Sequence, residues 1–114
     1  MESRVNFETL KTMTDGDIEF EKNLLAAFLT SAEECLDKLN AAIVTDDETL
    51  WRQQAHALKG NCYILGADML GGLCATAQAD WRADSKDKES MFKEIKSEFE
   101  AVRIAVDEHQ KNLC

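Results

Sequence analysis

Residues 51–65 read WRQQAHALKGNCYIL, and this stretch decides how the chain folds. Its apolar positions, spaced four, three, four and three residues apart, are Trp51, Ala55, Leu58, Cys62 and Leu65. This spacing places the five side chains on one face of an α-helix and is typical of helices that pack in bundles. Thr45 and Glu48 fit a capping box at the start of such a helix. Gly66 stands where helices commonly end in a left-handed residue. We therefore predict a helix over residues 46–65.

Similar spacings predict further helices on both sides of this one. Apolar residues recur every three or four positions along each helix, which marks one buried face. The expected helices cover residues 6–13, 17–44, 67–82 and 87–110. The longest carries its apolar face on Phe20, Leu24, Phe28, Ala32, Cys35, Leu39 and Ile43.

Nothing in the chain favours a sheet. No segment alternates as a strand does, and the chain has no proline and only five glycines. The expected fold class is therefore all-α. Helices with short connections pack best as an antiparallel up-down-up-down four-helix bundle, here with a short extra N-terminal helix. The length fits one domain over residues 1–114.

The composition excludes several classes of function. The chain has 22 Asp and Glu residues against 13 Lys and Arg residues, which gives a net charge of −9. Such a chain lacks the basic footprint that nucleic acid or an anionic membrane surface requires. No apolar run approaches the length of a membrane span, and no signal-peptide core follows the N-terminus. We expect a cytoplasmic protein, and polar outer helix faces favour a monomer.

Neither the cysteines nor the histidines predict a metal site. The cysteines form no Cys-x-x-Cys pair and no zinc-type spacing with histidine. Cys35, Cys62 and Cys74 fall on apolar helical positions, so we expect reduced thiols in the core. Carboxylate-bridged metal bundles need Glu-x-x-His pairs, and neither His56 nor His109 has a glutamate three residues before it. We expect no metal, and His109 receives no role.

One helical turn combines the elements of a reactive site. Lys59 and Gly60 follow His56 by three and four residues, so the three share a helix face. The imidazole could act as a nucleophile, the ammonium could bind an anion, and the glycine would leave room for that anion. Gly60 costs about 0.5–1 kcal/mol of helix stability relative to alanine, which a functional role would explain. From these residues alone, an ordinary exposed histidine remains the simpler interpretation.

The longer stretch AHALKGNCYILGADMLGGLC, residues 55–74, resembles the signature of histidine-containing phosphotransfer (HPt) domains. The family pattern is His-x-Leu-Lys-Gly, then Leu-Gly-Ala, then Leu-x-x-Leu-Cys, and every position keeps its spacing here. Length and number of helices also agree, so the resemblance covers essentially the whole chain. It implies a helical bundle that accepts a phosphoryl group on a histidine from one receiver-domain aspartate and passes it to another, in a multistep phosphorelay.

The resemblance assigns roles to single residues. His56 would be phosphorylated on its solvent-facing ring nitrogen, and Lys59 would pair with the phosphoryl oxygens. Gly60 would leave the space for them. Gln78, 22 residues after the histidine, would accept a hydrogen bond from the imidazole Nδ1–H and so fix the tautomer. The residues that we expect to contact a partner are Arg52, Gln53, Ala57, Tyr63 and Ile64.

The resemblance also says what the chain should need from others. No Walker loop and no kinase-type glycine loop is present, so we expect a phosphoryl carrier without an ATP site rather than an enzyme. The carrier would need no cofactor, because Mg²⁺ would reside on the partner receiver domain. The expected partners are the receiver domains of a hybrid sensor kinase and of a response regulator.

Two positions depart from the family pattern. Tyr63 is larger than the residue usually found near the site and could narrow the choice of partner, and Ala77 replaces a common leucine. The alternative function is a helical-bundle adaptor that binds receiver or kinase domains without being phosphorylated. Such an adaptor would need the helical bundle but not the residues for phosphotransfer. The presence of His56, Lys59 and Gly60 therefore argues against it.

Overall fold

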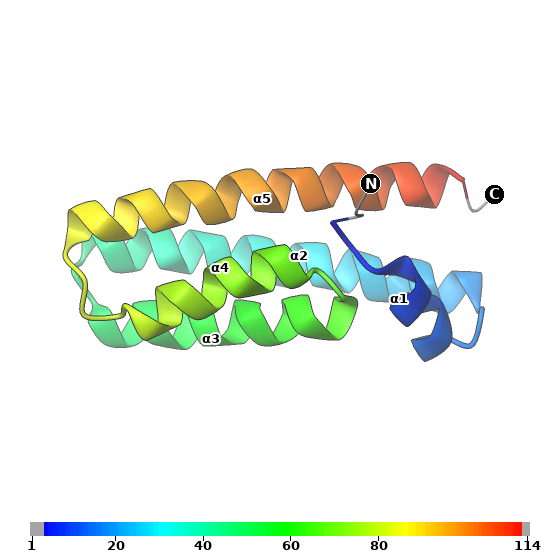
Figure 1. Ribbon diagram of the computed structural model, residues 1–114, viewed down its shortest axis with the longest axis horizontal. Helices are drawn as coiled ribbons and strands as arrows, with labels where there is room; N and C mark the ends of the chain where they lie inside the picture. The colour runs from blue at the N-terminus through cyan, green and yellow to red at the C-terminus, as the bar shows by residue number, and fades with distance from the viewer. Residues whose placement is uncertain (1–3, 113–114) are drawn as a thin grey trace.

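The computed structural model describes residues 4–112, and helices form nearly all of this part (Figure 1). The helices are α1 (Phe7–Met13), α2 (Ile18–Val44), α3 (Glu48–Leu65), α4 (Asp68–Ala79) and α5 (Ser85–Lys111). No strand occurs between residues 4 and 112. The all-α prediction is confirmed, and every predicted helix boundary lies within three residues of the observed one.

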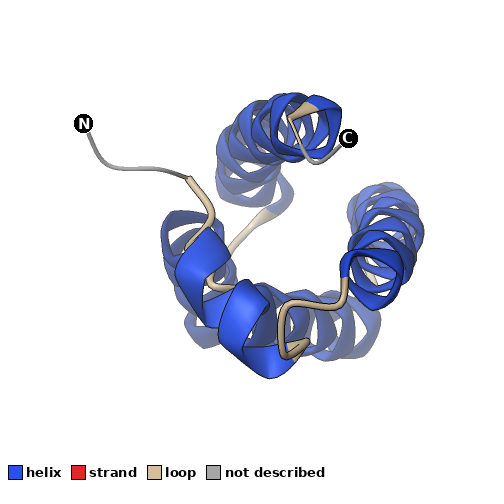
Figure 2. Ribbon diagram, turned by 90° about the vertical axis from the view of Figure 1, so that its right-hand side faces the viewer, coloured by secondary structure: helices blue, strands red, loops and turns tan. Residues whose placement is uncertain are grey.

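The helices α2 to α5 form an antiparallel bundle, and Figure 2 shows them end-on around a common centre. α3 packs against α2 and most closely against α4, while α5 packs against α4 and α2. α3 and α5 therefore occupy opposite corners of the bundle. The short α1 lies at one end and contacts α3 (Figure 1). Within the described residues, no helix is both long enough and apolar enough to cross a lipid bilayer.

The turn between α2 and α3 differs from the predicted capping box. The N-cap of α3 is Asp47, whose side chain accepts a hydrogen bond from the Leu50 amide at 3.0 Å. Thr45 instead ends α2, and its hydroxyl donates to the Ala41 carbonyl at 2.9 Å. The chain turns at Asp46, whose φ is +53°. The capping box was wrong because this left-handed residue completes the turn and lets α3 begin two residues later than predicted.

The start of α2 also departs from its predicted apolar face. Phe20 is 49% exposed, whereas Glu21 and Leu25 are buried. Glu21 faces inward because its carboxylate meets His109 of α5, with Oε2 and Nε2 3.3 Å apart. The His109 ring also stacks on Phe7, with ring centroids 3.8 Å apart. His109, to which the sequence assigned no role, thus joins α1, α2 and α5.

The three interior cysteines are free and buried, as predicted. Burial raises the pKa of the Cys35 thiol above its ordinary value. A hydrogen bond with Cys74 and burial raise the pKa of the Cys62 thiol much further. The Cys35 and Cys62 thiols therefore stay protonated at neutral pH, and all three cysteines serve as small core side chains.

Gly66 fixes the turn between α3 and α4 and the path of the N-terminal segment. Its φ of +83° confirms the predicted left-handed end of α3. Its carbonyl accepts a hydrogen bond from the Asn6 amide at 3.0 Å. A Cβ at Gly66 would lie 2.8 Å from Cβ of Asn6, so both its backbone conformation and its neighbour require glycine. The segment continues to Arg4, which forms an ion pair with Glu98 of α5.

Candidate functional site

His56 stands in the middle of α3, at the edge of its buried face. Ala55 and Leu58 on either side of it are fully buried, while His56 itself is exposed. Within residues 4–112, no hydrogen bond and no ion pair involves the imidazole. The helix is therefore held by its apolar face, and both ring nitrogens of His56 remain available for chemistry.

The helix surface beside His56 is open at Gly60. A Cβ built on Gly60 would meet no atom within 4 Å, and the backbone there is ordinary α-helix. The fold of the free chain therefore gives no reason for glycine, although glycine weakens a helix. Lys59 is half-buried and forms no ion pair with any described residue. An imidazole, an empty space and an unpaired cation thus lie within one helical turn.

Two contacts between α3 and α4 enclose the parts of these helices that carry His56 and Gln78. Toward one end of the pair, the ring of Tyr63 lies against Gly71, where an added Cβ would come within 2.7 Å of Tyr63 Cε1. Toward the other end, the Arg52 guanidinium lies over the Trp81 ring, with Cζ 5.3 Å from the centroid. The helices run antiparallel, so His56 on α3 and Gln78 on α4 both lie between these two contacts.

Gln78 is available for the predicted hydrogen bond but does not form it in this structure. Its Oε1 is buried and has no hydrogen-bond partner among the described residues. A buried acceptor without a partner costs about 1–3 kcal/mol, so a donor that reached it would be stabilised there. The Nδ1–H of His56 is the donor that the sequence predicts, and the pairing stays a prediction.

The sequence analysis gave Trp81 and Arg82 no role at this site. The Arg82 guanidinium also lies over Trp81, with Cζ 4.5 Å from the ring centroid. Arg52 and Arg82 thus share one indole, and neither forms an ion pair among residues 4–112. The sequence held a weak indication that Arg82 lies near the site, because Arg82 follows Gln78 by four residues and would share its helix face. However, α4 ends at Ala79, so only the register of the two helices reveals the contact.

The surface around His56 carries a different charge from the rest of the molecule. Residues 49–67 contain no Asp or Glu, although the whole chain has a net charge of −9. After its first residue, Glu48, the exposed side of α3 is therefore neutral to basic. All five residues predicted to contact a partner are exposed on this helix. The large apolar side chains among them are Tyr63, which is 47% exposed, and Ile64, which is 59% exposed. Such a surface suits an acidic protein partner.

No metal site accompanies these residues. Within the described part of the chain, no group of three or more His, Cys, Asp or Glu side chains is arranged to hold a metal ion.

Residues 23–105 match the family model of the Hpt domain. The chain belongs to the Hpt domain family. Its structure is similar to that of histidine-containing phosphotransfer protein B (HptB) from Pseudomonas aeruginosa PAO1, with a TM-score of 0.88 and 23% identity over 100% of both chains. It is also similar to the HPT domain of the Hpt sensor hybrid histidine kinase from Shewanella, with a TM-score of 0.78 and 20% identity over 96% of each chain. No curated protein sequence matches the chain significantly.

Membership in the family gives the general activity. The chain functions in histidine phosphotransfer within phosphorelays, and its family of phosphoryl carriers interacts with receiver domains of hybrid kinases and response regulators. The two solved structures add the fold, which is the helical bundle expected from the sequence.

Proposed function

We propose that His56 carries the phosphoryl group and moves it between the aspartates of two receiver domains. The observation that carries the proposal is the exposed, unpartnered imidazole beside the open helix surface at Gly60. Glycine at this position lowers the stability of the helix, although the packing of the bundle does not require it. A phosphoryl group on His56 would occupy it.

The transfer is a displacement at phosphorus. The lone pair on Nε2 of neutral His56 attacks the phosphorus of an aspartyl phosphate. The P–N bond forms as the P–O bond breaks, and the aspartate leaves as a carboxylate. Nδ1 keeps its proton throughout, which requires the tautomer protonated on Nδ1. The unpaired Oε1 of Gln78 supports this assignment, because it can accept that proton in a hydrogen bond.

The cations of the site would bind the group that is transferred. Lys59 would pair with the phosphoryl oxygens, and Arg52 would add charge from one turn earlier. These groups neutralise only part of the charge on the transferring oxygens. The remaining neutralisation would come from Mg²⁺ in the acidic pocket of the receiver domain. The chain itself would act as a carrier without an ATP site or cofactor.

The proposed docking surface is the exposed side of α3. Its residues are Arg52, Gln53, Ala57, Tyr63 and Ile64. The proposed partners are the receiver domains of a hybrid sensor kinase and of a response regulator, which would dock on one chain as a monomer. The lack of acidic residues from 49 to 67 supports this choice, because receiver pockets are acidic. Neither nucleic acid nor a membrane takes part.

Phosphotransfer from a labelled receiver domain tests the proposal. Wild type and His56→Gln are mixed with receivers carrying ³²P on aspartate, and the protein-bound label is tested for stability in acid and in base. Wild type should take up acid-labile, base-stable label, and His56→Gln should take up none. The matched control is His109→Gln, which removes the second of the two histidines and should keep the label. Label on His56→Gln, or none on folded wild type from any of several receivers, would overturn the proposal in favour of the adaptor.

A further inference from the structure

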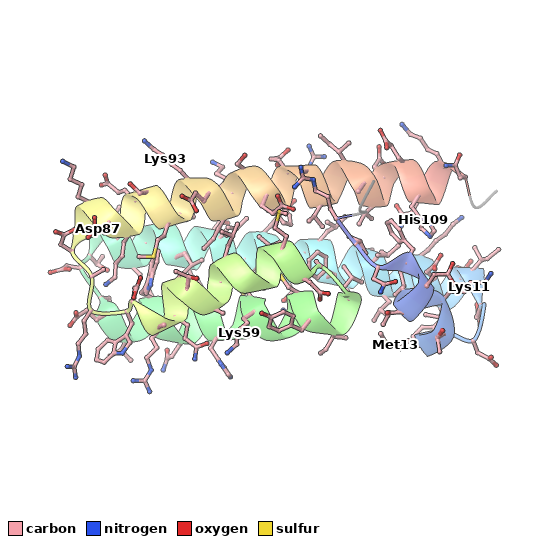
Figure 3. All side chains as sticks on the ribbon, viewed as in Figure 1. Lys11, Met13, Lys59, Asp87, Lys93 and His109 are labelled. Carbon is pink, nitrogen blue, oxygen red and sulfur yellow. The ribbon has the colours of Figure 1, made fainter. Side chains whose placement is uncertain are left out.

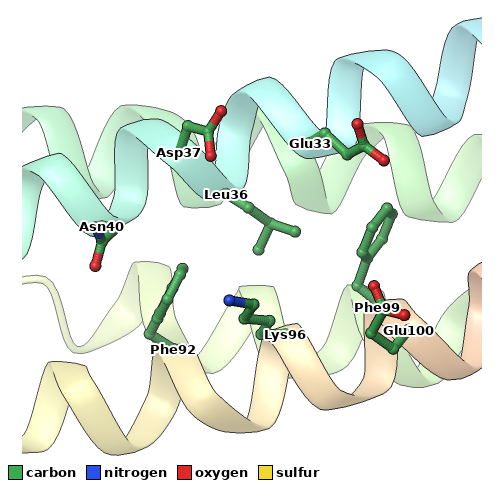
Figure 4. A pocket seen from close by; sticks show the side chains of 8 residues that line it. All are labelled: Glu33, Leu36, Asp37, Asn40, Phe92, Lys96, Phe99 and Glu100. Atoms are coloured by element: carbon green, nitrogen blue, oxygen red, sulfur yellow. The ribbon is translucent and has the colours of Figure 1, made fainter.

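A groove of about 370 Å³ lies between α2 and α5 (Figure 4). α2 and α5 form the side of the bundle opposite to the α3–α4 side, since α3 packs against α2 and α4 but not closely against α5. The groove is therefore separate from His56 and from the surface proposed for receiver docking.

The floor of the groove is apolar. Leu36 of α2 and Phe99 of α5 form its base and are 7% and 2% exposed. Phe92 stands seven residues before Phe99, points toward α2 and is only partly buried (Figure 4). Seven residues of helix span roughly 10 Å, or two turns. The floor thus offers an apolar strip of the length that two turns of another helix would cover.

The rim of the groove is acidic. Glu33 and Asp37, one turn apart on α2, form no ion pair with any residue between 4 and 112. Glu100 on the α5 side is paired with Arg103 at 2.8 Å. Lys96 is the cation that lines the groove, and its side chain lies between the two phenylalanine side chains (Figure 4). The two unpaired carboxylates, Glu33 and Asp37, therefore outnumber the single ammonium group of the groove.

We infer that this groove is a second docking site, which binds an amphipathic α-helix of a partner protein with basic residues beside its apolar face. Two packed helices with an apolar strip between them accept a third helix, and apolar side chains one or two turns apart fill such a groove. The acidic rim favours a helix with lysine and arginine beside its apolar face and disfavours one with aspartate and glutamate there. Because the groove lies across the bundle from His56, a partner bound there leaves the phosphotransfer surface free.

Model peptides test the inference directly. A fluorescein-labelled peptide of about 15 residues, with leucines three and four apart and lysines elsewhere, is long enough to form a helix on binding. Its counterpart carries glutamates in place of the lysines. The lysine peptide should bind the full chain and shift the backbone amide signals of residues 33–40 and 92–100. The glutamate peptide should bind at least about ten-fold more weakly.

Single charge changes on the rim should move the affinity in opposite directions. Asp37→Asn should weaken lysine-peptide binding and Lys96→Ala should tighten it, each by about two- to five-fold, as expected for exposed charge pairs. A gain for Lys96→Ala cannot arise from unfolding. The matched controls are Glu34→Gln and Lys93→Ala, which remove the same charges from the same helices outside the groove. Lys93 points away from the bundle (Figure 3). Both controls should change affinity by less than about two-fold.

Four outcomes would overturn the inference. The lysine peptide could fail to bind, or it could shift amides on α3 instead. The controls could change affinity as much as the rim variants, which would show unspecific attraction to an acidic chain. The protein alone could self-associate through the same amides, which would assign the groove to a second copy. All four leave the His56 proposal untouched, because phosphotransfer by the rim variants is measured separately and should equal that of wild type.

Discussion

Replacing Gly60 by alanine should make the protein more stable and less active. Gly60 lies inside α3 with ordinary helical backbone, and a Cβ there meets no atom within 4 Å. Alanine therefore brings no clash, and the substitution should add about 0.5–1 kcal/mol to the free energy of unfolding. For a domain of this length the melting temperature should rise by about 2–6 °C. Urea unfolding and thermal melting measure both quantities.

The same methyl group should slow phosphotransfer. It would project into the space that the phosphoryl group on His56 and the incoming receiver are proposed to occupy. A methyl forced into a close-packed contact costs about 1–3 kcal/mol, so the transfer rate should fall at least about five-fold. Initial rates of label transfer from a phosphorylated receiver measure this loss.

Gly72→Ala is the matched control, since Gly72 is also helical and has nothing within 4 Å of its added Cβ. It should gain similar stability and keep its transfer rate. Two results would refute the reasoning about Gly60. An unchanged transfer rate would show that the open space has no use, and a loss of stability would show that the space is not open.

Three further predictions concern the packing of the bundle. Gly71→Ala should lower the free energy of unfolding by about 1–3 kcal/mol in urea titrations, because its Cβ would lie 2.7 Å from Tyr63 Cε1, and adding Tyr63→Ala should recover much of this loss. Hydrogen bonding to a neighbouring thiol and burial raise the pKa of Cys62 in the folded state. The unfolded state therefore loses this proton first, so stability should fall as the pH rises above about 8.5, by up to ~1.4 kcal/mol per pH unit, and Cys62→Ala should flatten that slope. His109→Ala should cost about 1–3 kcal/mol in the same titrations, because it leaves the Glu21 carboxylate buried without its partner, and Glu21→Gln in that background should recover part of the loss.

The helices could be predicted because their apolar spacing is local information. Every third or fourth residue decides which face is buried, and this held along α3 from Trp51 to Leu65, where all five predicted positions are buried. Helix ends were harder. At the turn after α2, Thr45 and Asp47 were both acceptable caps by residue type. The choice depended on the left-handed backbone of Asp46, which residue type does not reveal.

Contacts between distant segments account for the other differences. Phe20 was predicted to be buried because it continues an apolar spacing, yet Glu21 takes the inward position. A buried carboxylate is favourable there only because His109, 88 residues later, lies beside it. The shared contact of Arg52 and Arg82 with Trp81 depends in the same way on the register of α3 and α4. Residue spacing within one helix carries no information about such pairs.

The arrangement of α3 explains how one helix can serve both the core and the reaction. Its apolar residues recur at three and four positions and are buried on one face, which fixes the helix against α2 and α4. The exposed surface of the helix is then free of packing demands, and there the chain keeps a histidine without a hydrogen-bond partner among the described residues and a glycine without a neighbour. Each is unfavourable or neutral for folding, so the folded chain alone does not explain them. A rigid helix that presents unsatisfied groups is what a transient phosphoryl acceptor needs, because neither partner must reorganise the bundle to reach the imidazole.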